Sequence, residues 1–190
     1  MANFRKAIDY LFSNETFTRN GSIVSHYENP ATGEISNWGI SLVWLRTVDP
    51  EATADTVRNL TREAAEQLYQ KYWWEENRIC NIPSDDIATK VLDMCVNCGA
   101  GTGIKILQDT LNMVLTPAKW LVPDGVIGPH VIACITEECA GSPEIQMLLT
   151  DLSRNLCKHY RDIAAKDPAK HAADLPGWLA RAGKLPGTVS

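Results

Sequence analysis

Residues 84–99 read SDDIATKVLDMCVNCG and carry the signals of one complete helix. Ser84 is a favourable N-cap, and the acidic residues Asp85 and Asp86 suit the positive end of a helix dipole. Gly99 is a natural stop. Between them lies an apolar stripe at helical spacing, made of Ala88, Val91, Leu92, Cys95 and Val96. We therefore predict a helix that buries this stripe against other elements.

Helical patterns also lie on both sides of this stretch. Residues 3–13 place their apolar side chains on one stripe, which ends at Ser13-Asn14-Glu15. Caps and first-turn prolines mark the other predicted helices. One begins at Thr61, one covers about 102–115, and one begins at Pro129. Another runs from Ser142 to about Lys166, and the last begins at Pro176. The chain after Pro50 is thus predicted to be helical almost to its end.

Residues 16–41 differ from the rest, because they are rich in Thr, Ser, Asn and Gly with short alternating apolar positions. The segment Asn29-Pro30-Ala31-Thr32-Gly33 predicts a turn, so we expect a small β-hairpin region directly after the first helix. The predicted fold class is mainly α. We expect a single domain over residues 1–190, with a part at 1–100 that contains the hairpin and a helical C-terminal part at 101–190.

Composition narrows the class of protein. The chain has 190 residues, of which 45% are hydrophobic and 22% are charged, which fits one globular domain. Its net charge of -5 argues against nucleic acid as a partner. No apolar run approaches the length of a membrane span, and the first residues lack the pattern of a Sec signal peptide. We expect a protein made in the cytoplasm, without stable insertion into a membrane.

The chain contains six cysteines, which invites a comparison between disulfides, metal ligands and buried thiols. A chain of this length can build its own core, so we expect mostly reduced, buried thiols. Cys95 and Cys98 are spaced as in redox and zinc motifs, but they end a helix and have no matching second pair. We predict no metal site and no cofactor.

Glu15 is the first candidate for chemistry. Cleavage of a glycosidic bond needs a protonated carboxylic acid beside the leaving oxygen, and partial burial favours that form. Glu15 ends an apolar helix between Phe12 and Phe17, and the hairpin that follows can form one wall of a cleft. On composition alone, an exposed Glu at a helix end is the more ordinary interpretation.

Several polar residues are candidate partners of Glu15. The hairpin residues Glu28 and Glu34 can supply a second carboxylate, and Ser36 can position a water molecule. Asp93 and Asn97 are four apart on the helix and share a face that is separate from its apolar stripe. They can bind sugar hydroxyls or tie helices together; we favour the structural role for Asp93 and the cleft for Asn97.

Aromatic residues are candidates for stacking on sugar rings. The candidates in this sequence are Trp38, Tyr72, Trp73 and Trp74. Aromatic residues at helical spacing more often belong to a core, so Trp38 in the hairpin is the favoured substrate-binding residue and Tyr72 the second.

Six motifs follow one another along the chain in the order of a known family. They are Gly39-Ile40-Ser41, the helix Ala64–Trp74, the segment Leu92–Gly99, Ile106-Leu107-Gln108, the turn Val122–Pro129, and the pair Tyr160-Arg161 with Gly177–Arg181. Together they resemble glycoside hydrolase family 108, the phage- and secretion-associated N-acetylmuramidases. The resemblance covers nearly the whole chain.

The resemblance implies a lysozyme-like fold and a peptidoglycan hydrolase. The family's catalytic Glu lies in a Glu-Gly-Gly-Tyr motif at the end of the first helix, which by position corresponds to Glu15. Here Thr16 and Phe17 replace the two glycines. Asn29 replaces an Asp in the hairpin, and Ser36 replaces a Thr. The resemblance therefore implies Glu15 as the general acid, with Glu28 or Ser36 assisting water.

The implied reaction is hydrolysis of the β-1,4 bond between N-acetylmuramic acid and N-acetylglucosamine. The implied partner is the glycan strand of peptidoglycan, and the C-terminal part resembles a peptidoglycan-binding segment. Action in the periplasm or cell wall then requires release by a holin or by secretion machinery, and an immunity protein if the chain is a toxin between bacteria. Two alternatives stay open. A lytic transglycosylase uses a single Glu without water, and a catalytically weakened wall-binding or secretion-accessory protein would bind without turnover.

Overall fold

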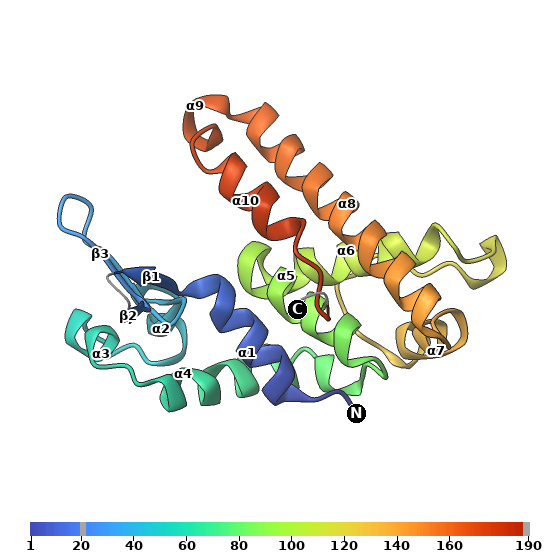
Figure 1. Cartoon of the computed structure of the whole chain (residues 1–190), viewed down its shortest axis with the longest axis horizontal. Helices are drawn as coiled ribbons and strands as arrows, with labels where there is room; N and C mark the ends of the chain where they lie inside the picture. The colour runs from blue at the N-terminus through green and yellow to red at the C-terminus, as the bar shows by residue number, and fades with distance from the viewer. Residues whose placement is uncertain (20–21, 188–190) are drawn as a thin grey trace.

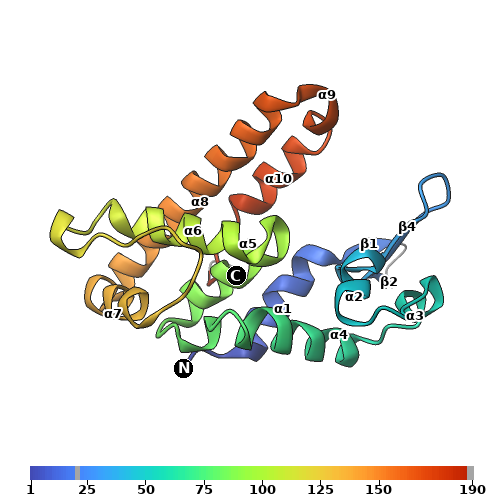
Figure 2. The ribbon, with the colours of Figure 1, turned by 180° about the vertical axis from the view of Figure 1, so that it is seen from behind.

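The computed structural model describes residues 1–19 and 22–187, with the side chains of 17–19, 22 and 23 left out, so the neighbour Phe17 predicted for Glu15 lies outside the described side chains. Helices form most of the molecule, and the strands gather in one small region (Figures 1 and 2). In chain order the elements are α1 (Phe4–Glu15), β1 (Phe17–Arg19), β2 (Ser22–Val24), β3 (His26–Asn29), β4 (Glu34–Asn37), β5 (Ile40–Ser41), α2 (Leu42–Val48), α3 (Ala54–Arg58), α4 (Arg62–Tyr69), the π-helical turn η1 (Gln70–Glu75), η2 (Ile79–Asn81), α5 (Asp85–Cys98), α6 (Ala100–Asn112), η3 (Pro117–Lys119), α7 (Pro129–Glu138), α8 (Ser142–Lys166), α9 (Pro168–His171) and α10 (Leu175–Ala182).

Helix α5 lies at the centre of the molecule, with α1, α6 and α8 packed around it. Its predicted ends are confirmed, because the Ser84 side chain accepts a hydrogen bond from the Ile87 N–H and Gly99 follows the last turn with φ +86°. The buried surface of α5 extends beyond the predicted stripe. Every residue from Ile87 to Cys95 is buried, and Asp93 is only 1% exposed. Neighbouring helices cover α5 on all sides, so its polar residues must find partners inside the protein.

The hairpin region forms where the sequence predicted it, immediately after α1. Strands β3, β4 and β5 form an antiparallel sheet in which Tyr27 pairs with Ser36 and Glu28 pairs with Ile35. The buried Asn37 fixes this sheet to α3, because its amide donates to the carbonyl oxygens of Val57, Arg58 and Leu60. The sheet is thereby anchored on one face and open on the other.

Two helix starts differ from the predictions. Helix α2 begins at Leu42, before Pro50, because the Ser41 side chain caps it. The N-cap of α8 is Gly141 rather than Ser142, which is already the first helical residue. The end of α8 at Lys166 is as predicted, and Pro176 lies in the first turn of α10.

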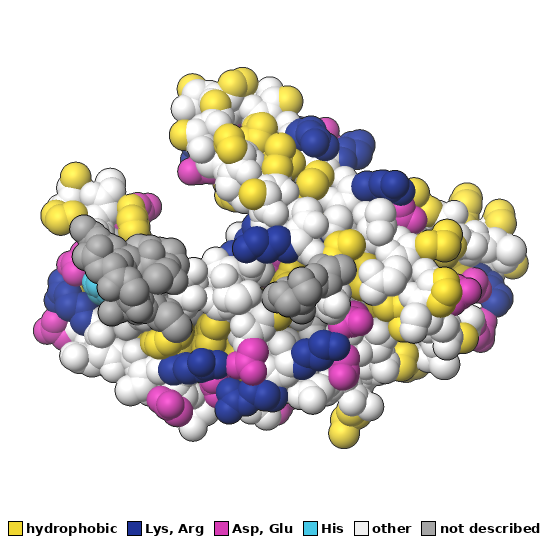
Figure 3. Space-filling view, viewed as in Figure 1, with side chains coloured by type: hydrophobic (Ala, Val, Ile, Leu, Met, Phe, Trp, Pro, Cys, Tyr) yellow, Lys and Arg dark blue, Asp and Glu magenta, His cyan; other side chains and the backbone are white. Residues whose placement is uncertain are grey.

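Helices α8, α9 and α10 form an arm that projects from the body beside the hairpin (Figures 1 and 2). Figure 3 shows the surface hollowed between the hairpin and this arm. The C-terminal end of α1 lies below the hollow (Figure 1). In the described part of the chain, no helix is both long and apolar enough to span a membrane.

Candidate active site

Glu15 is the last residue of α1 and is held by groups from three other elements. Its side chain is 17% exposed, and its Oε1 lies 2.6 Å from Nη2 of Arg181 on α10. Tyr69 of α4 and the backbone of Gly39 close the site from the hairpin side. The carboxyl group is thus partly buried in a fixed position at the boundary between the hairpin and the arm.

Gly39 allows this close packing. Its φ of +78° lies in the left-handed region, which a glycine adopts readily. A Cβ at this position would lie 2.8 Å from Cδ of Glu15 and 2.6 Å from the hydroxyl oxygen of Tyr69. The Tyr69 hydroxyl in turn donates to the carbonyl oxygen of Trp38 at 3.0 Å. Burial, and then the charge of Glu15, raise the pKa of Tyr69 well above its usual value, so its hydroxyl stays a neutral donor.

Asp93 supplies a second buried carboxylate behind Arg181. Its Oδ1 lies 2.9 Å from Nη2 of Arg181 and accepts a hydrogen bond of 3.0 Å from Nε. The same oxygen accepts from the side-chain amide of Asn14 at 3.1 Å. Burial alone would lower the pKa of Arg181, but Asp93 and then Glu15 raise it above its usual value. The guanidinium is therefore a permanent cation that contacts the carboxyl groups of both Glu15 and Asp93.

The chain just after Arg181 is bound to α5 and α1, which together form a helical wall of the site. The buried Lys90 donates from Nζ to the carbonyl oxygens of Ala182 and Lys184, at 2.7 and 2.8 Å. Burial lowers the pKa of Lys90 to about 8. The Lys184 ammonium donates to the side-chain oxygen of Asn14 at 2.7 Å. These contacts fix the end of α10 against α5 and α1, and with it the position of Arg181.

The predicted hairpin residues Glu28 and Ser36 lie on opposite faces of the sheet. Their cross-strand partners are adjacent, and side chains alternate between the two faces of a strand. Glu28 forms an ion pair with Arg58 of α3, at 2.5 Å between Oε1 and Nη2, and this hydrogen bond lowers its pKa. Ser36 pairs across the sheet with Ser41 instead.

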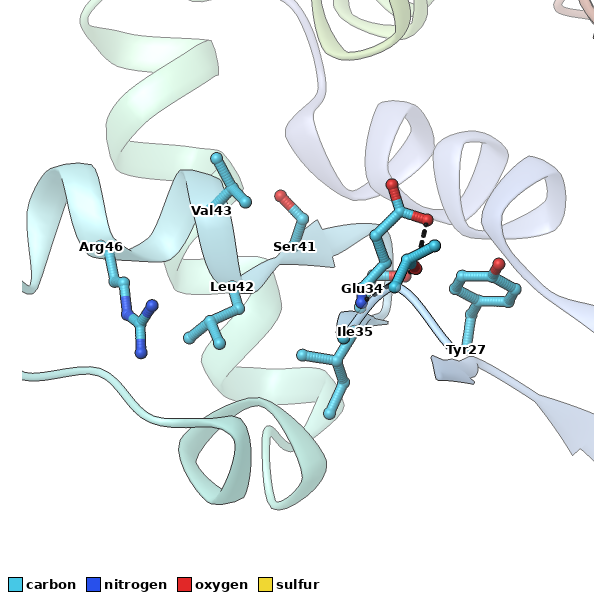
Figure 4. A pocket seen from close by; sticks show the side chains of 10 residues that line it. Tyr27, Glu34, Ile35, Ser41, Leu42, Val43 and Arg46 are labelled. Carbon is cyan, nitrogen blue, oxygen red and sulfur yellow. Dashed lines mark hydrogen bonds between the residues drawn. The ribbon is translucent and has the colours of Figure 1, made fainter. Parts of the chain in front are cut away.

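Ser36 and Ser41 line a cavity of about 430 Å³ between the hairpin and α2. In Figure 4, Tyr27 and Glu34 stand at the hairpin end of this cavity and Arg46 stands at the α2 end. Glu15 does not line it. Ser41 is nevertheless only two residues from Gly39, about 7 Å along an extended strand, so the cavity is close to the acid.

The other predicted sugar-binding residues occupy three different places. The Trp38 ring packs against Phe12, with 5.1 Å between ring centroids, next to the Glu15 site. Asn97 donates to the hydroxyl of Tyr160 on α8, one helical turn beyond Asp93. Tyr72 packs against Trp44 of α2, within an aromatic cluster that continues through Trp73.

Three residues of the site were not singled out from the sequence. Gly39 and Arg181 stand inside family-like motifs, but nothing local indicates that they contact Glu15. Tyr69 lies one helical turn before Trp73, where helical spacing indicates a core residue. The contacts that define their roles join residues far apart in the chain, so only the folded structure reveals them.

The described residues contain no group of three or more His, Cys, Asp or Glu side chains that could hold a metal ion. The described cysteines are free thiols. Burial raises the pKa of Cys98 to about 12 and that of Cys95 still further, which disfavours the thiolate that a metal or a redox reaction needs.

Comparisons with known proteins fit this geometry. Residues 13–99 match the family model described as glycosyl hydrolase 108, and residues 102–183 match the predicted peptidoglycan domain. The solved structure of SagA from Brucella abortus has a TM-score of 0.65 and 19% sequence identity, covering 94% of this chain and 92% of that chain. At this identity the likeness concerns the fold alone. No curated protein matches the sequence.

These matches define the molecule as a glycoside hydrolase that acts on peptidoglycan. Residues 13–99 of the chain are similar to glycosyl hydrolase family 108. The predicted resemblance to this family is thereby confirmed, as is the mainly α, lysozyme-like fold.

Proposed function

We propose that the protein is an N-acetylmuramidase, which hydrolyses the β-1,4 bond between N-acetylmuramic acid and N-acetylglucosamine with Glu15 as the general acid. The observation that carries the proposal is the position of Glu15 at the end of α1. This end of the helix lies below the hollow between the hairpin and the arm, and the Glu15 side chain is 17% exposed. A glycan strand in this hollow would pass over the end of α1, where the partly buried Glu15 lies within the family match.

In this reaction Glu15 gives its proton to the leaving glycosidic oxygen. Ser36 is the proposed positioning group for the attacking water, because it lies on the sheet face that Glu28 does not share. Glu28 is occupied by Arg58 on the other face. A water held by the Ser36 hydroxyl attacks the anomeric carbon from the face opposite the leaving group, and the new C–O bond forms as the glycosidic bond breaks. The proton released by this water passes to solvent, so we propose inversion at the anomeric carbon.

Trp38 and Asn97 are the proposed contacts to the glycan. Trp38 is next to the acid, and its ring is only partly buried. Asn97 is half-buried on α5, one turn beyond Asp93. We assign Tyr72 no contact to the glycan, because its ring packs against Trp44.

The test compares Glu15→Gln with Glu66→Gln on isolated peptidoglycan sacculi. Glu66 is a matched control, because its side chain is also 17% exposed and is also paired with an arginine, Arg62, at 2.9 Å. Loss of a general acid lowers the rate by about 10²–10⁴-fold, which we expect for Glu15→Gln. Glu66→Gln should release fragments at close to the wild-type rate. Undiminished release by Glu15→Gln would reject the proposed acid.

Mass spectrometry of the released fragments tests the bond. N-acetylmuramic acid at the new reducing end is the expected product. A reducing end of N-acetylglucosamine would assign the other glycosidic bond, and a 1,6-anhydro end would make the protein a lytic transglycosylase. Binding to sacculi without any release would reject hydrolysis and leave a wall-binding protein.

A further inference from the structure

Asp93 is a buried charged residue, and its position in the core does not by itself explain why a charge is placed there. It is a carboxylate with 1% exposure, and its Oδ1 shares Nη2 of Arg181 with Oε1 of Glu15. Its Oδ1 accepts hydrogen bonds from Arg181 and Asn14, whereas its buried Oδ2 has no hydrogen-bond partner among the described residues. A buried carboxylate with an unpartnered oxygen lowers the stability of the fold, so Asp93 at this position points to a benefit for the site and not for stability.

Charge counting within this group shows what Asp93 contributes. Glu15, Arg181 and Asp93 form one chain of contacts at 2.6 and 2.9 Å. When Glu15 carries its proton, Arg181 and Asp93 balance each other and the group is neutral. Without Asp93, the group is neutral only when Glu15 has lost its proton. Removal of Asp93 would therefore leave the charge of Arg181 unbalanced beside Glu15 in a buried site.

The other charged and titratable groups near Glu15 do not supply this balance. Among the described side chains, those facing it are Arg181 from α10, Asp93 from α5 and Tyr69 from α4. Tyr69 is neutral. Lys90 and Lys184 approach from behind Asp93 and Asn14, and Tyr10 lies beside them with its pKa raised to about 12 by burial and Asp93.

We propose that Asp93 is a positioning residue that neutralises Arg181 and so keeps the proton on Glu15 until it is given to the leaving oxygen. Arg181 fixes the carboxyl group in place, and Asp93 cancels the charge that would otherwise remove its proton. This inference rests on Glu15 being the general acid. It also assigns a role at the reacting group to the segment that matches a peptidoglycan-binding domain, because Arg181 belongs to that segment.

The test is the pH dependence of the initial rate at low concentrations of soluble glycan strands, which follows kcat/KM and reports ionisations of the free enzyme. In Asp93→Asn, the alkaline limb of the profile should move to lower pH by roughly one to three units, the usual effect of an unbalanced arginine on a carboxyl group. In Arg181→Gln, which leaves two carboxylates together, the limb should move to higher pH. The double variant Asp93→Asn/Arg181→Gln restores charge balance, so its limb should return close to that of the wild type.

Asp86→Asn is the matched control. Asp86 is on the same helix and is paired with Lys6 at 2.7 Å, but it lies two turns away, about 10 Å along the helix axis. Its profile should keep the wild-type limb. A merely structural role for Asp93 would lower the rate at every pH without moving the limb, and the double variant would then be worse than either single variant.

The outcomes separate the two proposals. If Glu15→Gln is inactive and the limb of Asp93→Asn does not move, the inference is wrong while the proposed acid stands. If Glu15→Gln is fully active, the proposed function fails first. Should Asp93→Asn alone not fold, Arg181→Gln and the double variant still differ only at Asp93, and equal limbs in these two would overturn the inference.

Discussion

The hairpin and the helical wall around α5 hold their polar groups in opposite ways. On the hairpin, the Glu28–Arg58 ion pair is formed by side chains that are 36% and 43% exposed. In the wall, Arg181 and Asp93 are 16% and 1% exposed and have several fixed partners. Solvent weakens the first kind of contact, whereas the second persists in a medium of low dielectric constant. The helical wall therefore holds Glu15 in place, and the hairpin forms the more exposed side of the site.

The two regions meet at Gly39, and its substitution should have the largest effect. Gly39→Ala would place Cβ within 2.8 Å of Glu15 and within 2.6 Å of the Tyr69 hydroxyl. One of these groups must shift by an ångström or so, which typically lowers a catalytic rate by about 10²-fold. We expect this loss in the rate of release from sacculi, together with a lower Tm.

Gly33→Ala is the control for this substitution. Gly33 has a similar φ of +71°, but no atom lies within 4 Å of its Cβ position. The cost of a left-handed alanine is therefore the same, whereas the contact with the acid is absent. Equal losses of activity in the two variants would mean that backbone strain, and not contact with Glu15, explains the effect.

Burial of Lys90 in the helical wall around α5 should make the free energy of unfolding depend on pH. Its pKa of about 8 in the folded protein is lower than the ordinary value near 10.4 of an unfolded chain. Between these pH values the unfolded chain holds more protons, so the free energy of unfolding rises with pH. Burial of the charged Lys90 thus costs on the order of 3 kcal/mol below pH 8, and this cost is relieved above it.

Urea unfolding of the wild type and Lys90→Met at several pH values measures this contribution. The difference in the free energy of unfolding, wild type minus variant, should increase between pH 8 and pH 10. The loss of the hydrogen bonds to Ala182 and Lys184 shifts that difference by a constant, without adding a slope. A difference that does not change with pH would contradict the depressed pKa.

Asn37 tests the anchored face of the hairpin sheet. Its buried amide donates to three carbonyl oxygens at the end of α3. Asn37→Ala leaves these oxygens without that donor, so we expect a loss of about 2 kcal/mol in the free energy of unfolding. The exposed Asn59, which donates to the Asp55 carbonyl oxygen at 2.9 Å, provides the comparison. A loss in Asn59→Ala as large as that in Asn37→Ala would remove the special role of burial.

Glu28→Gln should have the smallest effect. The ion pair with Arg58 is on the surface, where solvent offsets most of its attraction. We expect Tm and the rate of release from sacculi to remain near the wild-type values. A loss of rate comparable with that of Glu15→Gln would instead make Glu28 the second catalytic carboxylate.

Local signals were sufficient to predict most helix boundaries. Ser84 and Gly99 act on the residues beside them, so the ends of α5 follow from short-range rules. The surroundings of α5 do not follow from such rules, because three other helices pack around it and its polar residues are buried with the rest. Asp93 is therefore a buried ion-pair partner of Arg181.

The site divides in the same way. Glu15 could be predicted, because it ends a recognisable helix in front of a hairpin and matches a family motif by position. Arg181 could not, since 166 residues separate it from Glu15 in the chain and neither its spacing nor its neighbours indicate a role at the acid. Its role depends on how α10 returns to the end of α1.

The ion pair between Glu15 and Arg181 also joins two stretches that are matched by separate family models. They are therefore not interchangeable modules. A hybrid that combined this N-terminal stretch with the C-terminal stretch of a relative would need an arginine at the position on its last helix that corresponds to Arg181.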